Sequence, residues 1–348
     1  RRMSAEPEII FDLRDGIAQV TLNRPQALNA LTLNMVRIFD SQLAAWELDD
    51  AVRGIVVRGA GDKAFCAGGD IQKLYEGGPK SLITQEFFRE EYRLNWRIHN
   101  YPKPYIAIMD GITMGGGVGL SVHASTRIAA DNTVFAMPET GIGLFPDVGG
   151  SWFLPRLPGE LGMYMAMTGA RLKSADCIYA EICDAYLPND RHEDFIMALR
   201  AGERVEYALA RLSIAPGPAP LAEVRDAIDL CFSGRSVEEI VMALKADGSE
   251  WSTNQLSIMA GKSPTAQKVA YRQLQEGAAL DFDGCMVMEY RLSQVFMEGG
   301  DIFEGIRAVV VEKDMSPKWS PASLSDLSDA DVARYFTPLG ERDLTFPV

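Results

Sequence analysis

The run from Met137 to Gly150 carries the two carboxyl groups best suited to chemistry, Glu139 and Asp147, among apolar, glycine and proline residues. A carboxylate in such surroundings is costly to bury unless it is paired, hydrogen-bonded or protonated, so we expect its pKa to be raised. A carboxyl group of this kind can act as general acid, general base or nucleophile. The spacing alone equally allows structural roles, with Glu139 capping a helix or forming a salt bridge and Asp147 starting a turn.

Two glycine-rich turns, Phe65–Asp70 and Met114–Gly119, could supply the electrophilic part of a site. Without side chains, their backbone N–H groups can approach a ligand closely, and the second turn precedes a predicted helix with an electropositive N-terminus. Two such donors on one carbonyl oxygen would form an oxyanion hole, which stabilises the charge that develops on an attacked thioester or in an enolate. The alternative is that both glycine clusters serve only tight turns and close packing.

The sequence lacks the motifs that are typical of dinucleotide-binding and nucleotide-hydrolysing proteins. Gly115, Gly117 and Gly119 do not have the Gly-x-Gly-x-x-Gly spacing of a dinucleotide-binding turn, and no phosphate-binding Gly-x-x-x-x-Gly-Lys-Ser/Thr motif is present, so the sequence does not favour NAD binding or nucleotide hydrolysis. The formal charge of −14 argues against a nucleic-acid partner, which would need a basic surface. Any anionic ligand must therefore meet a local positive site.

These residues are placed by an alternation of strands and helices. The Asp15-Gly16 pair predicts a hairpin turn, and Thr32 predicts the N-cap of a helix that ends near Leu48. Strands are predicted at 9–13, 17–22, 54–58, 105–110, 127–130 and 133–136, and a further helix at 84–99. This pattern indicates an α/β core over residues 1–187. Helical periodicity dominates residues 188–348, which predicts a mostly helical C-terminal region that completes the substrate pocket.

Composition indicates a globular enzyme or binding protein. The 348 residues are 47% hydrophobic, and no apolar run reaches membrane-spanning length, so we expect no membrane segment. The five cysteines are scattered without metal-ligand spacing, which predicts free thiols and no metal site. Arg1-Arg2-Met3 leads into polar residues, so we expect no signal or transit segment at this start.

Several motifs together resemble the crotonase (enoyl-CoA hydratase/isomerase) superfamily. They are Phe65–Ile71, the glycines 115–117 after Met109-Asp110-Gly111, and Pro138-Glu139, in this order and at these separations, with Arg24–Leu31 in support. The resemblance covers nearly the whole chain. It implies a core of repeated ββα units wound into a spiral, with the substrate thioester held between two oxyanion donors.

Within that superfamily, further segments resemble the 3-hydroxyisobutyryl-CoA hydrolase family. They are Phe87–Tyr92, Gly143–Gly150, and Phe303–Ala308 with Pro317–Trp319. The most specific is Phe-Pro-Asp-Val-Gly-Gly, at residues 145–150.

The resemblance assigns roles by position. Gly69 and Gly116 would donate the oxyanion-hole amides, Glu139 and Asp147 would be the two acidic catalytic residues, and Glu91 would contact substrate together with Gly116, Glu139 and Asp147. On its own spacing, Glu91 reads only as part of the polar face of an amphipathic helix.

One departure from the superfamily bears on the reaction. Hydratases typically carry a second glutamate shortly after the triple glycine, where this chain has Gly119, and a glycine where it has Asp147. Simple hydration is therefore disfavoured.

We therefore expect hydrolysis of a short branched β-hydroxyacyl-CoA, 3-hydroxyisobutyryl-CoA of valine catabolism, without a metal or redox cofactor. The alternatives are enoyl-CoA hydratase or isomerase activity, with Glu139 as the only catalytic acid/base, and a silent acyl-CoA-binding or assembly subunit. Arg24, Lys73 and Lys318 are candidates for the phosphates of coenzyme A, each equally able to be a solvated charge. A homo-oligomer is expected from the family, and the location is expected to be a bacterial cytoplasm or, alternatively, the mitochondrial matrix.

Overall fold

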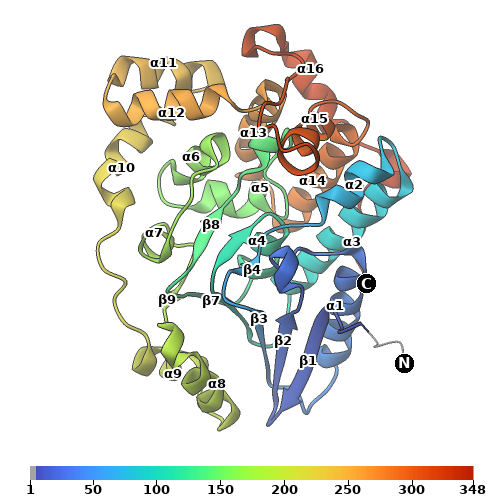
Figure 1. Cartoon of the computed structure of the whole chain (residues 1–348), viewed down its shortest axis with the longest axis vertical. Coiled ribbons are helices and arrows are strands. Elements are labelled where there is room, and N and C mark those ends of the chain that lie inside the picture. The colour runs from blue at the N-terminus through green and yellow to red at the C-terminus, as the bar shows by residue number, and fades with distance from the viewer. Residues whose placement is uncertain (1–4, 348) are drawn as a thin grey trace. The chain divides into compact units, whose positions relative to one another are not determined.

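The computed structural model describes residues 5–347 (Figure 1), so the expectation about Arg1-Arg2-Met3 falls outside the described residues. The chain divides into two compact units that interleave in sequence. The first contains the chain up to Gly69, Arg97–Phe135 and Leu172–Ala219, and the second contains Asp70–Trp96, Ala136–Arg171 and the chain from Pro220 onward. The domain boundary that the sequence predicts at residue 187 marks the point where strands give way to helices, and it does not follow these two units. This boundary stays a prediction.

The first unit is built on a six-stranded sheet. Its strands in spatial order are β1 (Ile9–Arg14), β2 (Ile17–Leu22), β3 (Gly54–Gly59), β5 (Tyr105–Met109), β7 (Thr126–Ala129) and β9 (Ala185–Tyr186). β1 and β2 form the predicted antiparallel hairpin, with Asp15 at φ 50° and Gly16 at φ 80° in its turn. All the other pairs are parallel, with Ile17 opposite Gly54 and Ile55 opposite Tyr105.

A second sheet reveals the repeat in the chain. It contains β4 (Ala64–Cys66), β6 (Ile112–Met114) and β8 (Val134–Ala136). In the pairs β3–β4, β5–β6 and β7–β8, the first strand joins the large sheet and the second joins the small one, and a helical segment follows each pair. The predicted fold class, a crotonase-like spiral of ββα units, is confirmed by this topology.

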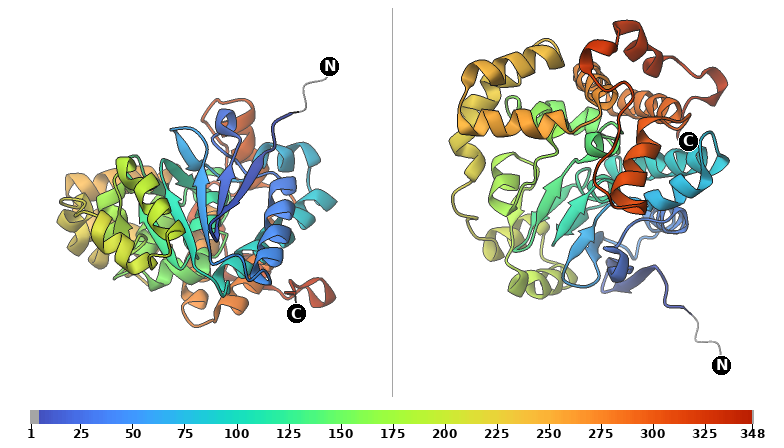
Figure 2. Two further views of the ribbon diagram at one scale, coloured as in Figure 1. Left: turned by 90° about the horizontal axis from the view of Figure 1, so that it is seen from below. Right: turned by 45° about the horizontal axis from the view of Figure 1, so that its top comes forward.

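Helices complete the first unit. They are α1 (Leu33–Glu47), α4 (Gly116–Ser121), α7 (Ser174–Tyr179), α8 (His192–Arg200) and α9 (Val205–Leu212), with 3-10 turns η1 (Pro25–Ala27) and η4 (Asn189–Arg191). Thr32 caps α1 as predicted, because its Oγ1 accepts a hydrogen bond from the Met35 amide at 3.1 Å. Helices α8 and α9 lie next to each other (Figure 2). Phe195 of α8 and Leu212 of α9 are buried in one cluster with Ile106 of β5.

The second unit is helical. Its helices are α2 (Ile71–Gly77), α3 (Leu82–His99, which runs past the unit boundary), α5 (Gly150–Phe153), α6 (Leu161–Thr168), α10 (Pro220–Cys231), α11 (Val237–Asp247), α12 (Glu250–Ala260), α13 (Pro264–Gly277), α14 (Phe282–Phe296), α15 (Asp301–Ile306) and α16 (Asp329–Ala333). Short turns are η2 (Glu139–Ile142), η3 (Leu154–Arg156), the π-helical η5 (Arg307–Val311), η6 (Leu324–Asp326), η7 (Arg334–Phe336) and η8 (Gly340–Arg342). In both figures α11 and α12 run side by side.

Findings on the C-terminal region, the cysteines and long apolar helices complete the description of the fold. From residue 188 to residue 347 the named elements are all helical, which confirms the mostly helical C-terminal region. All five cysteines are buried and free, as predicted. Within residues 5–347, no helix has both the length and the apolar character needed to cross a membrane.

Candidate active site

Four buried carboxyl groups gather in the second unit, and we call them the carboxyl cluster. Glu91 lies on α3, Glu139 begins η2, Asp147 lies just before α5, and Glu289 lies on α14. Their exposed fractions are 3%, 4%, 6% and 0%. The negative charges of Asp147 and Glu289 raise the pKa of both Glu91 and Glu139, so the four groups interact electrostatically.

Burial is the largest cause of the pKa shift at every member of the cluster. It raises the pKa of Glu91 and Glu139 well above the usual carboxyl range, that of Asp147 to about 7 and that of Glu289 to about 8. Removing a carboxylate from water disfavours its charged form, and like charges nearby add to the effect. The raised pKa values predicted for Glu139 and Asp147 are therefore present, and the cluster holds protons near neutral pH.

The carboxyl group of Glu139 is free to interact with a substrate or a water molecule. Neither of its oxygens accepts a hydrogen bond from the described residues, nor does Oε2 of Glu91. Among those residues Glu139 forms no salt bridge, and its side chain caps no helix, which removes both structural alternatives considered from the sequence. Its own backbone N–H acts to lower the pKa, and burial outweighs this effect. A buried polar group without a partner is costly, and a substrate group or water can supply the partner.

Asp147 is held in a defined orientation. The hydroxyl of Tyr92, which is fully buried on α3, donates a hydrogen bond to Asp147 Oδ2 at 3.1 Å. The carbonyl oxygen of Asp147 also accepts from the Gly150 amide at 2.9 Å, so the residue does begin a turn, as the structural alternative proposed. Asp147 therefore both starts a turn and holds a carboxyl group in the cluster, so the structural and the chemical interpretations of this residue are compatible.

Helix α13 supports the same turn from another side. Nε2 of Gln273 donates to the Pro146 carbonyl at 2.6 Å and to Ser151 Oγ at 2.8 Å. Gly277 lets the helix come this near, since a Cβ there would lie 2.2 Å from the Ser151 carbonyl oxygen. The position of the turn is thus fixed by helix packing as well as by its own sequence.

Sequence reasoning missed four residues around the cluster: Glu289, Tyr92, Gln273 and Asn95. Asn95 follows Glu91 by one helical turn on α3, is fully buried, and has no hydrogen-bond partner at either side-chain polar atom. A signal for Glu289 was present, because it occupies a position on the apolar stripe formed by Phe282, Cys285, Met286 and Phe296.

The two glycine turns meet within the first unit. A Cβ added to Gly115 would lie 3.2 Å from the Cα atom of Gly68, so the turns carrying Gly69 and Gly116 are in contact. Gly116 is the first residue of α4, where an amide has no acceptor inside its own helix. The structure therefore brings the two predicted oxyanion-donor turns together.

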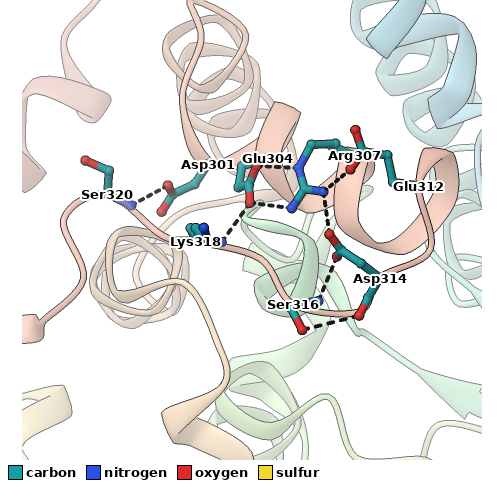
Figure 3. A network of polar contacts seen from close by, with 8 residues as sticks. All are labelled: Asp301, Glu304, Arg307, Glu312, Asp314, Ser316, Lys318 and Ser320. Carbon is teal, nitrogen blue, oxygen red and sulfur yellow. Dashed lines mark hydrogen bonds and ion pairs between the residues drawn. The ribbon is translucent and has the colours of Figure 1, made fainter.

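The three basic residues considered for coenzyme A differ in their surroundings. In the first unit, Arg24 Nη1 donates to the Ala30 carbonyl at 2.6 Å, which gives its guanidinium a structural task. Lys73 and Lys318 are exposed in the second unit. The backbone amide of Lys318 donates to Glu304 Oε2 at 2.7 Å (Figure 3), which fixes the chain at this position.

Figure 3 also shows what holds the segment around Lys318. Arg307 pairs with Glu304, Glu312 and Asp314 at 2.6 to 2.7 Å. The motif 303–308 that carried part of the family resemblance therefore includes the centre of an ion-pair network. Among the described residues, no group of three or more His, Cys, Asp or Glu side chains is arranged to hold a metal ion.

Comparison with known proteins identifies relatives along almost the whole chain. The profile of the enoyl-CoA hydratase/isomerase family matches residues 17–336. A protein from Danio rerio described as mitochondrial 3-hydroxyisobutyryl-CoA hydrolase is 47% identical, with 98% of this chain and 92% of that protein covered. The protein of the same description from Homo sapiens is 44% identical, with 99% and 92% covered.

Solved structures share the fold. A crystal structure described as a carnitinyl-CoA dehydratase from Mycobacterium thermoresistibile has a TM-score of 0.93 and 41% identity, with 98% of this chain and 99% of that chain covered. One described as an enoyl-CoA hydratase from Rhodobacter sphaeroides has a TM-score of 0.92 and 37% identity, with 98% and 100% covered. The descriptions of these relatives name two kinds of reaction, thioester hydrolysis and addition or removal of water.

The close contact between the two glycine-rich turns leads to a prediction about stability. Gly117→Ala would place a Cβ atom 2.0 Å from the Cys66 carbonyl oxygen, so we expect the free energy of unfolding to fall by about 1–3 kcal/mol or more. Gly54→Ala is the matched control in the same unit, because its Cβ would meet neighbours at ordinary distances of 3.5 to 3.7 Å. Denaturant unfolding of both variants measures the difference. Equal stabilities would contradict the close approach.

The raised pKa of Asp147 yields a prediction about stability and pH. A carboxyl group with a folded-state pKa of about 7, against an ordinary 3.8, destabilises the fold progressively as pH rises from about 4 to 7. Asp147→Asn removes this ionisation, so the variant should gain stability relative to wild type across that window, by at most about 1.4 kcal/mol per pH unit. Urea unfolding at several pH values measures it. A stability difference that is independent of pH would contradict the raised pKa.

Proposed function

Because the chain belongs to the enoyl-CoA hydratase/isomerase family, we propose that it hydrolyses the thioester of 3-hydroxyisobutyryl-CoA to 3-hydroxyisobutyrate and coenzyme A. The observation that carries this proposal is the buried Glu139 carboxyl group, which has two unpartnered oxygens and interacts with Asp147. The identity of 44–47% with proteins described as 3-hydroxyisobutyryl-CoA hydrolase, over nearly the full chain, selects the substrate. This reaction is a step of valine catabolism.

Two routes through Glu139 fit the geometry. As general base, it takes a proton from water as the water oxygen bonds to the thioester carbon; the C–S bond then breaks and the coenzyme A thiolate takes up a proton. As nucleophile, its carboxylate oxygen bonds to the thioester carbon, the C–S bond breaks and coenzyme A leaves as a thiolate that takes up a proton; water then opens the acyl anhydride, which releases the acid and regenerates Glu139. A raised pKa suits either route near neutral pH, because it brings the proton affinity of Glu139 closer to the operating pH.

The remaining site residues are proposed with narrower tasks. Asp147 would orient the 3-hydroxyl group or share the proton transfer, and its hydrogen bond from Tyr92 supports a fixed orientation. Gly69 and Gly116 would donate their amides to the developing oxyanion, a proposal supported by the contact between their turns. Glu91 would contact substrate, in keeping with its unpartnered Oε2.

A second candidate function is water addition to an enoyl-CoA, or isomerisation of its double bond. The descriptions of the two solved structures with 41% and 37% identity favour it. Gly119, where hydratases of the superfamily typically carry a second glutamate, argues for hydrolysis. A silent acyl-CoA-binding or assembly subunit is the third possibility, and the assay below separates it from both.

Further properties are part of the proposal. The substrate would bring coenzyme A, and we propose no resident metal or redox cofactor. Lys73 and Lys318 are proposed for its phosphates ahead of Arg24, which has a structural task. A homo-oligomer is proposed from the family. The curated relatives are described as mitochondrial, which supports the matrix over a bacterial cytoplasm as the location.

The reaction type is tested with the purified protein. Incubation with 3-hydroxyisobutyryl-CoA should release free thiol, followed with a thiol reagent, whereas crotonyl-CoA should keep its enoyl absorbance. Enoyl turnover without thiol release would refute the hydrolase and favour the hydratase. If neither substrate reacts, the silent subunit is favoured.

The role of Glu139 is tested by Glu139→Gln. Because the amide can neither accept the water proton nor attack the carbonyl, kcat for thiol release should fall by about 100-fold or more. Circular dichroism and thermal unfolding serve as controls for the fold. A folded Glu139→Gln variant with wild-type kcat would show that this carboxyl group does not carry the reaction.

A further inference from the structure

The carboxyl group of Glu289 differs from that of Glu139 in having both oxygens occupied. Its Oε1 accepts a hydrogen bond from the Gly149 amide at 3.0 Å, and its Oε2 accepts one from the Ser151 amide at 3.2 Å. The side chain is fully buried on α14, about 140 residues away along the sequence. Glu289 is therefore bound to the backbone of the turn that carries Asp147.

The two amides belong to the start of α5. Gly149 is the N-cap of this helix and Ser151 is its second residue, and amides at these positions have no acceptor within the helix. No side chain of the N-cap residue fills them, because the residue is glycine. A helix of four residues is too short to persist without tertiary support. Glu289 supplies the missing acceptors from α14.

The turn itself needs such support. Val148 has a φ of 49°, in the left-handed region that a β-branched residue rarely adopts. A conformation of this kind persists only where its surroundings enforce it. Glu289 from α14 and Gln273 from α13 both bind the backbone of residues 146–151, on the two sides of Asp147 in sequence.

We propose that Glu289 is a positioning residue for the hydrolysis proposed above. It clamps the amides of Gly149 and Ser151 so that Asp147 keeps one orientation. This inference rests on the proposed function, because hydrolysis is the reaction that Glu289 would support. The hydrogen bonds of Glu289 to the turn are observed independently of that reaction.

The titratable groups that face Glu289 include the other three members of the carboxyl cluster. Asp147, Glu91 and Glu139 lie on other elements, the Tyr92 hydroxyl lies on α3, and the Cys285 thiol lies one turn earlier on α14. Burial raises the pKa of Glu289 to about 8, although the backbone amides of Gly149 and Ser151 and the side chain of Ser151 act to lower this pKa. Glu289 is therefore ionised only above about pH 8, and there its charge raises the pKa of Glu139. Removal of that charge should let Glu139 ionise at lower pH.

The test is Glu289→Gln, assayed by release of coenzyme A over a range of pH. The glutamine has the same size but can accept from only one of the two amides, so kcat should fall by about 10- to 100-fold with little change in KM, as expected when a catalytic group is displaced. Above about pH 8, where Glu289 is ionised in the wild-type protein, the pH profile of kcat/KM should also shift downward, because the charge beside Glu139 is gone. A purely structural role would lower stability without moving this profile.

Two further variants complete the experiment. Glu276→Gln, at a half-buried position of α13 where the carboxylate pairs with Arg272, removes a carboxylate outside the cluster and should keep wild-type kcat and pH profile. Glu289→Asp keeps the charge but shortens the reach, so it should lower kcat and leave the pH profile in place. It also serves if the glutamine variant does not fold.

Wild-type kcat and an unmoved profile in a folded Glu289→Gln protein would overturn the proposal, as would wild-type kcat in Glu289→Asp. Release of coenzyme A by the wild-type protein in the same assay tests the proposed function separately. The Glu289 role is judged on the ratio of variant to wild type.

Discussion

The burial of four carboxyl groups in one cluster is the constraint on which the candidate site depends. Glu91, Glu139, Asp147 and Glu289 come from α3, η2, the turn before α5, and α14, and no described residue forms an ion pair with any of them. Four charges so placed would be costly, so the cluster lowers the cost by retaining protons. Two members use hydrogen bonds to fix the turn, while Glu139 and Oε2 of Glu91 remain without partners. The free-energy cost of burial therefore falls mainly on the unpartnered oxygens of Glu139 and Glu91, to which a bound substrate could donate hydrogen bonds.

Much of the fold followed from local signals. The Asp15-Gly16 turn and the alternation in its flanking strands predicted the first hairpin, and Thr32 predicted the start of α1 correctly. The pKa shift of Glu139 was also predictable, because a carboxylate amid apolar residues has few ways to stay charged. Three-residue β4 was missed, since a strand that short inside a glycine-rich loop has no periodicity to detect.

The support of the Asp147 turn could not be predicted, because it is tertiary. Tyr92, Gln273 and Glu289 reach the turn from three helices that lie far from the turn itself in sequence, and no spacing rule relates them to it. The sequence did contain one unused sign, namely a single carboxylate on the apolar stripe of α14. Glu91, by contrast, was named only through resemblance, because its own spacing suggested a solvent-facing residue, whereas the structure buries it.

The account rests on carboxyl groups that keep their protons near neutral pH, and infrared spectroscopy observes this directly. The carbonyl stretch of a protonated carboxyl group is separate from the bands of a carboxylate. We predict such bands in the wild-type protein at pH 7, fading as pH rises through the ionisation of Asp147 and Glu289 near 7 and 8, and reduced by one group in Glu289→Gln. A spectrum at pH 7 without protonated carboxyl bands, unchanged in that variant, would contradict the account.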